Sequence, residues 1–120
     1  MSDRQPAVDL TALDRLLDMT GGDVEFLDEL VETYLADGPV QLGAMREAAL
    51  NGSAGGLIRP SHSLKSNSAN LGAAHLADLC RVLEATARDG VVDGAIERVA
   101  AAEAEFEEVR AALLAVRANR

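Results

Sequence analysis

The sequence is poor in aromatic residues and cysteine, and it has no long apolar run. Aromatic residues make up only 2% of the 120 residues, so the core must consist of Leu, Val, Ile, Ala and Met, which favours helix packing over a sheet. Cys80 is the single cysteine, which excludes an intramolecular disulfide, and we interpret it as a small buried hydrophobe. No apolar run approaches the roughly 20 residues that span a bilayer. The hydrophobic content of 48% still allows one domain over residues 1–120.

Basic residues are scarce as well. Eleven Lys and Arg face 20 Asp and Glu, and the net charge of −9 argues against binding to nucleic acid or to anionic membranes. The spacing of histidine, cysteine and acidic residues matches neither a zinc nor a calcium site, so no metal site is predicted. The opening residues 1–6 are polar, unlike a signal peptide, and we therefore expect a cytoplasmic protein.

Glycine, proline and capping residues divide the chain into six predicted helices. Asp9 or Thr11 caps the first helix, and Asp23 caps the second. Gly38-Pro39 interrupts the second pattern, so a third helix is expected to start there. The last three helices are predicted at about 57–71, 73–89 and 92–118. The inward positions of the second, third and last helices include Phe26, Val40, Leu50 and Ile96. Such one-sided stripes predict an all-α, antiparallel helical bundle.

His62 lies beside the buried stripe of its helix, not within it. At about 100° per residue, His62 is roughly 140° from Leu57 and points toward solvent. Its helical neighbours are Ile58, Lys65, Ser66 and Ala69, which supply one cation and two small side chains. A nucleophilic imidazole needs exposure and a nearby cation. The alternative is an ordinary surface histidine beside a solvated lysine.

A helical hairpin around Gly72 would bring the next helix beside His62. Glu84 could then accept a hydrogen bond from the non-reacting ring nitrogen and set the tautomer, although the sequence does not fix the rotation of the two helices. Arg88 falls on the same flank as Glu84. His75 has Asp78 three positions later in place of a lysine, and we interpret it as a structural or surface residue.

The stretch that begins at His62 resembles the histidine-containing phosphotransfer (HPt) domain family. The matching residues are His62-Ser-Leu-Lys-Ser-Asn-Ser-Ala-Asn-Leu-Gly-Ala, then Leu76, Leu79-Cys80 and Leu83-Glu84, and upstream Gly21-Gly22-Asp23, Phe26-Leu27, Leu30, Tyr34-Leu35 and Pro39. The resemblance covers nearly the whole chain. It implies a four-helix bundle with additional short N-terminal helices. One departure is Pro60-Ser61, where the family usually has alanines, so the helix is expected to start near Arg59-Pro60 or to kink there.

The resemblance also implies a function. In the family, a histidine accepts a phosphoryl group from a receiver-domain aspartyl phosphate and passes it to another receiver. Here His62 would be the phosphoacceptor, Lys65 would hold the phosphoryl oxygens, and Ser66 would leave a gap for docking. Ala69, Glu84 and Arg88 are supporting candidates. The docking surface is expected to include Ile58, Ala69, Ala73, Leu13 and Leu17.

The expected partners are response-regulator receiver domains and a hybrid sensor kinase, and a monomer is the simpler expectation. The chain is expected to bind no cofactor, with Mg²⁺ held by the receiver, and to be a phosphocarrier without kinase activity of its own. Two alternatives remain open. The chain could be a non-catalytic helical adaptor, or, if it is a fragment, the phosphotransfer module of a larger sensor kinase.

Overall fold

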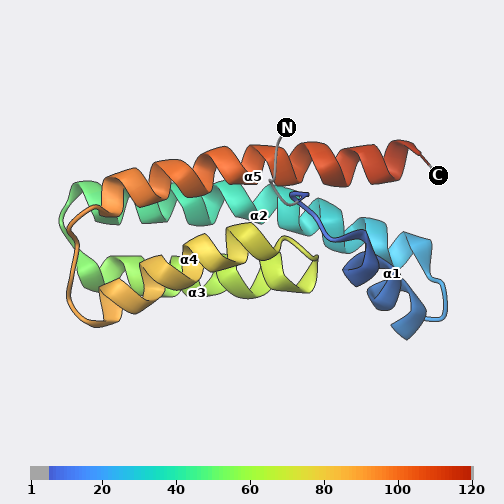
Figure 1. The fold of residues 1–120 in the computed structure, drawn as a ribbon, viewed down its shortest axis with the longest axis horizontal. Coiled ribbons are helices and arrows are strands. Elements are labelled where there is room, and N and C mark those ends of the chain that lie inside the picture. The colour runs from blue at the N-terminus through green and yellow to red at the C-terminus, as the bar shows by residue number, and fades with distance from the viewer. Residues whose placement is uncertain (1–5, 120) are drawn as a thin grey trace.

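Four long helices pack side by side as an antiparallel bundle, and a fifth, short helix lies at one end (Figure 1). The computed structural model describes residues 6–119, so the segment 1–5, on which the expected lack of a signal peptide largely rests, lies outside the described residues. The helices are α1 (Leu10–Met19), α2 (Val24–Leu50), α3 (Ala54–Asn70), α4 (Ala74–Arg88) and α5 (Ala95–Ala118). Both α2 and α4 pack against α3 and α5, which closes the bundle. The predicted all-α four-helix bundle is therefore confirmed.

The four bundle helices differ in length, and this difference gives α1 its place. Helices α2 and α5 have 27 and 24 residues, whereas α3 and α4 have 17 and 15. At 1.5 Å per residue, α2 is about 40 Å long and α3 about 25 Å. Helix α1 lies beside the part of α2 that extends beyond the α3–α4 hairpin (Figure 1). The Asp9 amide donates a hydrogen bond of 2.8 Å to the Gly72 carbonyl, which ties the start of α1 to the turn of that hairpin.

The prediction that Gly38-Pro39 separates two helices is wrong, because α2 continues through it. One uninterrupted stripe is buried along the whole helix: Leu27, Val31, Tyr34, Gly38, Leu42, Met45 and Ala49. Gly38 belongs to this stripe because a Cβ atom there would overlap the ring of Phe106 on α5. Pro39 lies on the exposed side of α2. Tertiary packing thus outweighs the local interruption.

Helix α3 also starts earlier than predicted, at Ala54. The Ser53 hydroxyl accepts a hydrogen bond of 3.0 Å from the Gly56 amide and caps the helix. Pro60 is then an internal residue of α3, buried against the core, and the expected start near Arg59-Pro60 is wrong. The seven residues from Ala54 to Pro60 make almost two helical turns ahead of His62.

Four residues predicted to face inward are exposed instead: Phe26, Val40, Leu50 and Ile96. Phe26 comes directly before the buried Leu27, and Ile96 comes directly after the buried Ala95. Successive residues lie about 100° apart around a helix, so each of these two side chains points away from the core when its neighbour points inward. None of the helices within residues 6–119 combines the length and the apolar character that crossing a bilayer requires.

Candidate functional site

His62 stands on the outer side of α3, as its helical position predicts. Leu57, Ser61, Leu64 and Ser68 are all buried and fix the rotation of the helix. The Ser68 hydroxyl lies 2.8 Å from the hydroxyl of Tyr34 on α2, so this polar group is paired inside the bundle. With the helix held in this orientation, the His62 side chain is 56% exposed. The imidazole is therefore open to a docking protein.

Glu84 on α4 is the residue that orients the His62 ring. Its Oε2 atom lies 3.1 Å from His62 Nδ1, which is the predicted pairing. Glu84 is buried, and a carboxylate accepts hydrogen bonds but cannot donate them, so Nδ1 is the ring nitrogen that carries the proton. The other nitrogen, Nε2, has no hydrogen-bond partner among residues 6–119. Its lone pair is therefore the one available for a bond to an incoming group.

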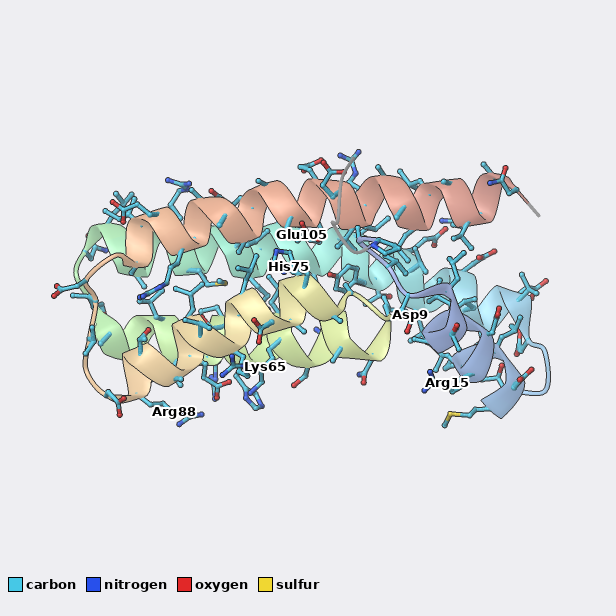
Figure 2. The ribbon with its side chains drawn as sticks, in the orientation of Figure 1. Asp9, Arg15, Lys65, His75, Arg88 and Glu105 are labelled. Atoms are coloured by element: carbon cyan, nitrogen blue, oxygen red, sulfur yellow. The ribbon has the colours of Figure 1, made fainter. Side chains whose placement is uncertain are left out.

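Two cations share the same carboxylate. Lys65 Nζ donates a hydrogen bond of 2.5 Å to Glu84 Oε1. Arg88, one turn further along α4, donates from Nε at 3.0 Å and from Nη2 at 2.8 Å, both to Oε2. The hydrogen bond from Lys65, followed by those from Arg88 and His62, lowers the pKa of Glu84 to about 2, although burial acts in the opposite direction. Figure 2 shows Lys65 and Arg88 on the side of the α3–α4 hairpin that faces away from α5.

This arrangement can support nucleophilic chemistry at His62 Nε2. A neutral imidazole with a fixed Nδ1 proton presents its lone pair in one direction. The ammonium of Lys65, one turn away on α3, supplies positive charge next to the ring. Such a pair suits attack on an electrophile whose oxygens carry negative charge, as a phosphoryl group does.

The remaining predicted site residues divide between surface and core. Ser66 and Ala69 are exposed and continue the His62 face along α3, whereas Ile58 is partly buried. Leu17 on α1 is also partly buried.

Leu13 and Ala73, which we expected on the docking surface, are buried in the core. Leu13 is 4% exposed and Ala73 is fully buried, so neither side chain can contact a partner. The physical reason is that α1 packs its inner face onto the bundle end, and the α3–α4 turn is covered by that packing. Helix α1 therefore acts as a lid at these positions.

A groove of about 740 Å³, which we did not predict from the sequence, lies where α1, α2 and the end of α3 meet. Its apolar lining comes mainly from Leu16, Met19, Phe26, Leu30 and Ala69. Met19 is 83% and Phe26 41% exposed, which is unusual for large apolar side chains. A signal was present, since Phe26, Leu30, Thr33 and Asp37 recur at helical spacing beside the buried stripe of α2. Ala69 joins the groove to the face of α3 that carries His62.

The other titratable candidates lie apart from this site. His75 is exposed on the side of α4 that faces α5, away from Lys65 (Figure 2). Cys80 is fully buried, and burial raises the pKa of its thiol to about 12, so it is a core residue as predicted. Within the described part of the chain, no three His, Cys, Asp or Glu side chains come together as metal ligands would.

Comparisons with known proteins agree with this geometry. The family model of the Hpt domain matches residues 29–117. The crystal structure of histidine-containing phosphotransfer protein B (HptB) from Pseudomonas aeruginosa PAO1 is similar to the whole fold, with a TM-score of 0.87 and 29% sequence identity over 98% of this chain and 99% of that one. No curated protein gives a significant match. The chain therefore belongs to the Hpt domain family, whose members exchange phosphoryl groups with receiver domains as phosphocarriers, and it functions in a phosphorelay.

Proposed function

We propose that His62 is the residue on which this chain carries the phosphoryl group. It would accept the group from an aspartyl phosphate on one receiver domain and pass it to another. The observation that carries the proposal is the orientation of the ring: Glu84 holds Nδ1 at 3.1 Å, while the side chain remains 56% exposed. An imidazole that served only as a surface side chain would not need a buried carboxylate behind it.

In the transfer step, the lone pair of His62 Nε2 attacks phosphorus in line with the bond to the aspartyl oxygen. The N–P bond forms as the P–O bond breaks, and the electron pair of that bond leaves with the aspartate carboxylate. The Nδ1 proton stays on the ring, so the phosphorylated imidazole becomes a cation next to Glu84. Little covalent work is required of the protein, and positioning and charge stabilisation supply the catalysis.

Three charged side chains support His62 in different ways. Glu84 sets the tautomer and stabilises the ring cation through its contact with Nδ1. Lys65, whose side chain is 30% exposed, supplies positive charge to the phosphoryl oxygens. Arg88 shares Glu84 with both of them. Ser66 and Ala69 contribute by being small, because they leave room for the receiver beside the ring.

The docking surface runs from Ile58 and His62 along α3, through Ala69, into the groove beside Met19 and Phe26. Helix α3 carries two basic residues and no acidic one, although the chain as a whole has a net charge of −9. This local charge suits the acidic pocket of a receiver domain. We propose that the Mg²⁺ needed for transfer is held in that pocket and that this chain binds no cofactor.

The upstream donor in this proposal is the receiver domain of a hybrid sensor kinase. The chain would act as a monomer in the cytoplasm. It would have no kinase activity of its own, since the proposed chemistry needs a phosphorylated partner and not ATP.

The proposal is tested with response-regulator receiver domains charged with radiolabelled acetyl phosphate. Label is expected to move to the wild-type chain as a phosphoramidate that is labile in acid and stable in alkali. The His62→Gln variant should take up no label, and the matched His75→Gln variant, altered at the other histidine, should behave like wild type. Equal labelling of His62→Gln would refute the assignment. Stable receiver binding without any label on the wild type would favour a non-catalytic adaptor instead.

A further inference from the structure

The two oxygens of the buried Glu84 carboxylate contact different partners. Oε1 accepts the hydrogen bond from Lys65 at 2.5 Å. Oε2 accepts both hydrogen bonds from Arg88, at 2.8 and 3.0 Å, and it also faces His62 Nδ1 at 3.1 Å. Lys65 and Arg88 therefore do not compete for the same atom. Either cation can leave while the other stays in place.

This arrangement matters because the Lys65 ammonium has two possible partners, Glu84 and the incoming phosphoryl group. In the resting state its ammonium is bound to Glu84, yet the incoming phosphoryl oxygens need that same charge. If Lys65 were the only cation on Glu84, its departure would leave a buried carboxylate, 8% exposed, without a positive partner. Removing one partner from a buried charge is costly. That cost would oppose the movement of Lys65 toward the phosphoryl group.

We propose that Arg88 is a positioning residue that releases Lys65 for the transfer reaction by remaining bound to Glu84. This inference rests on the proposed role of His62. As the N–P bond forms at Nε2 and the leaving group takes the electron pair of the broken bond, Lys65 shifts from Oε1 to the phosphoryl oxygens. Arg88 stays on Oε2, where it keeps Glu84 neutralised and in contact with the protonated Nδ1. Arg88 acts through Glu84 and Lys65 and does not touch the phosphoryl group.

The charged groups around this site on both helices support that division of roles. Arg88 has Nε and Nη2 engaged on Glu84, so its planar guanidinium is fixed by two bonds. Within residues 6–119, Lys65 makes one side-chain hydrogen bond, at the end of a flexible stem, and such an ammonium moves easily. Arg81 on α4 is bonded to Asp78 instead, at 2.9 Å, and takes no part in the cluster. Arg81 is 59% exposed and Arg88 57%, which makes Arg81 a matched control.

The experiment measures the rate at which phosphoramidate, a small phosphodonor, phosphorylates the full chain. Wild type is compared with Arg88→Ala, Arg88→Lys, Lys65→Ala, the double variant lacking both cations, and Arg81→Ala. We expect Arg88→Ala to slow the reaction about tenfold, a size typical of coupling between contacting charged residues. Arg88→Lys should restore most of the rate, and Arg81→Ala should leave it unchanged. In the Lys65→Ala background, removal of Arg88 should slow the reaction much less than tenfold, because no Lys65 remains to be released and only the contact of Arg88 with Glu84 is lost.

A second readout follows Lys65 itself. In the ¹⁵N spectrum of its ammonium group, phosphorylation should shift the Lys65 signal in wild type, and the shift should be much smaller in Arg88→Ala at equal labelling. Three results would overturn the inference: an unchanged phosphorylation rate in Arg88→Ala, an equal loss of rate in Arg81→Ala, or a loss of rate in the double variant that equals the product of the two single losses. The third result would indicate that Arg88 contacts the phosphoryl group directly. If wild type takes no label at His62, the proposed function fails first. Labelled His62 with an unchanged Arg88→Ala rate refutes only the inference.

Discussion

Replacing Glu84 by glutamine should destabilise the fold in a way that depends on pH. The carboxyl pKa is about 2 in the folded chain, against an ordinary value of 4.5, mainly because Lys65 donates a hydrogen bond to it. That difference corresponds to about 3 kcal/mol. The cations are partly exposed, 30% for Lys65 and 57% for Arg88, so solvent screening reduces the expected contribution to about 1–2 kcal/mol.

The sign of the pH dependence follows from the lowered pKa. A carboxyl whose folded pKa lies below its unfolded value stabilises the fold fully above pH 4.5, and this stabilisation disappears as the pH falls toward about 2. Glu84→Gln should therefore lose about 1–2 kcal/mol of unfolding free energy at pH 7. At pH 3, the difference in unfolding free energy between this variant and wild type should be less than half of its value at pH 7.

Urea unfolding followed by circular dichroism at pH 7, 5 and 3 measures this difference. Glu47→Gln is a suitable control, because Glu47 is exposed on α2 and the substitution should change stability by less than about 0.5 kcal/mol. If Glu84→Gln lowers the unfolding free energy by the same amount at pH 7 and pH 3, the packing of the side chain and not its charge accounts for the loss. No loss at pH 7 would refute the stabilising role of the cluster.

Three further predictions concern packing and docking. Gly38→Ala should lower the unfolding free energy by about 1–3 kcal/mol, because its Cβ would overlap Phe106. Gly43 on the same helix has open space around it, so Gly43→Ala should raise the unfolding free energy by about 0.5–1 kcal/mol. Equal effects of the two substitutions in urea unfolding would contradict this. Ser61→Ala should raise the unfolding free energy by about 1 kcal/mol, since the buried hydroxyl has no hydrogen-bond partner within residues 6–119; a loss in the same assay would mean the hydroxyl is satisfied. Phe26→Asp should raise KM for a phosphorylated receiver about tenfold and leave labelling by phosphoramidate unchanged, and an unaltered KM would remove the groove from the docking surface.

The sequence was sufficient to predict the helical bundle and the rotation of α3. The stripe through Leu57, Leu64 and Ser68 is strongly periodic, and it places His62 outward as the structure does. From the sequence alone, the pairing of His62 with Glu84 is a hypothesis, because hydrogen-bonding partners on two helices depend on their relative rotation. That rotation is set by contacts between α3, α4 and their neighbours, which no single stretch of sequence encodes.

The errors have a common physical origin in tertiary packing. Gly38-Pro39 and Pro60 are local signals for a helix end, yet burial of the stripes on either side keeps α2 and α3 continuous. Leu13 and Ala73 were expected on the surface, and the close approach of α1 to the α3–α4 turn buries them. The groove beside Phe26 has only a partial signal in the sequence, the helical spacing of Phe26, Leu30 and Thr33 on α2, because the space itself exists only where three helices meet.

The central claim is that phosphoryl transfer occurs at Nε2 of His62 while Glu84 holds Nδ1. The most direct test is ³¹P and ¹⁵N spectroscopy of the chain after phosphorylation by phosphoramidate, with histidine nitrogens labelled. We predict one phosphoryl group, coupled to His62 Nε2, and a proton retained on His62 Nδ1. A phosphoryl group on Nδ1 of His62, or on His75 in its place, would contradict the account.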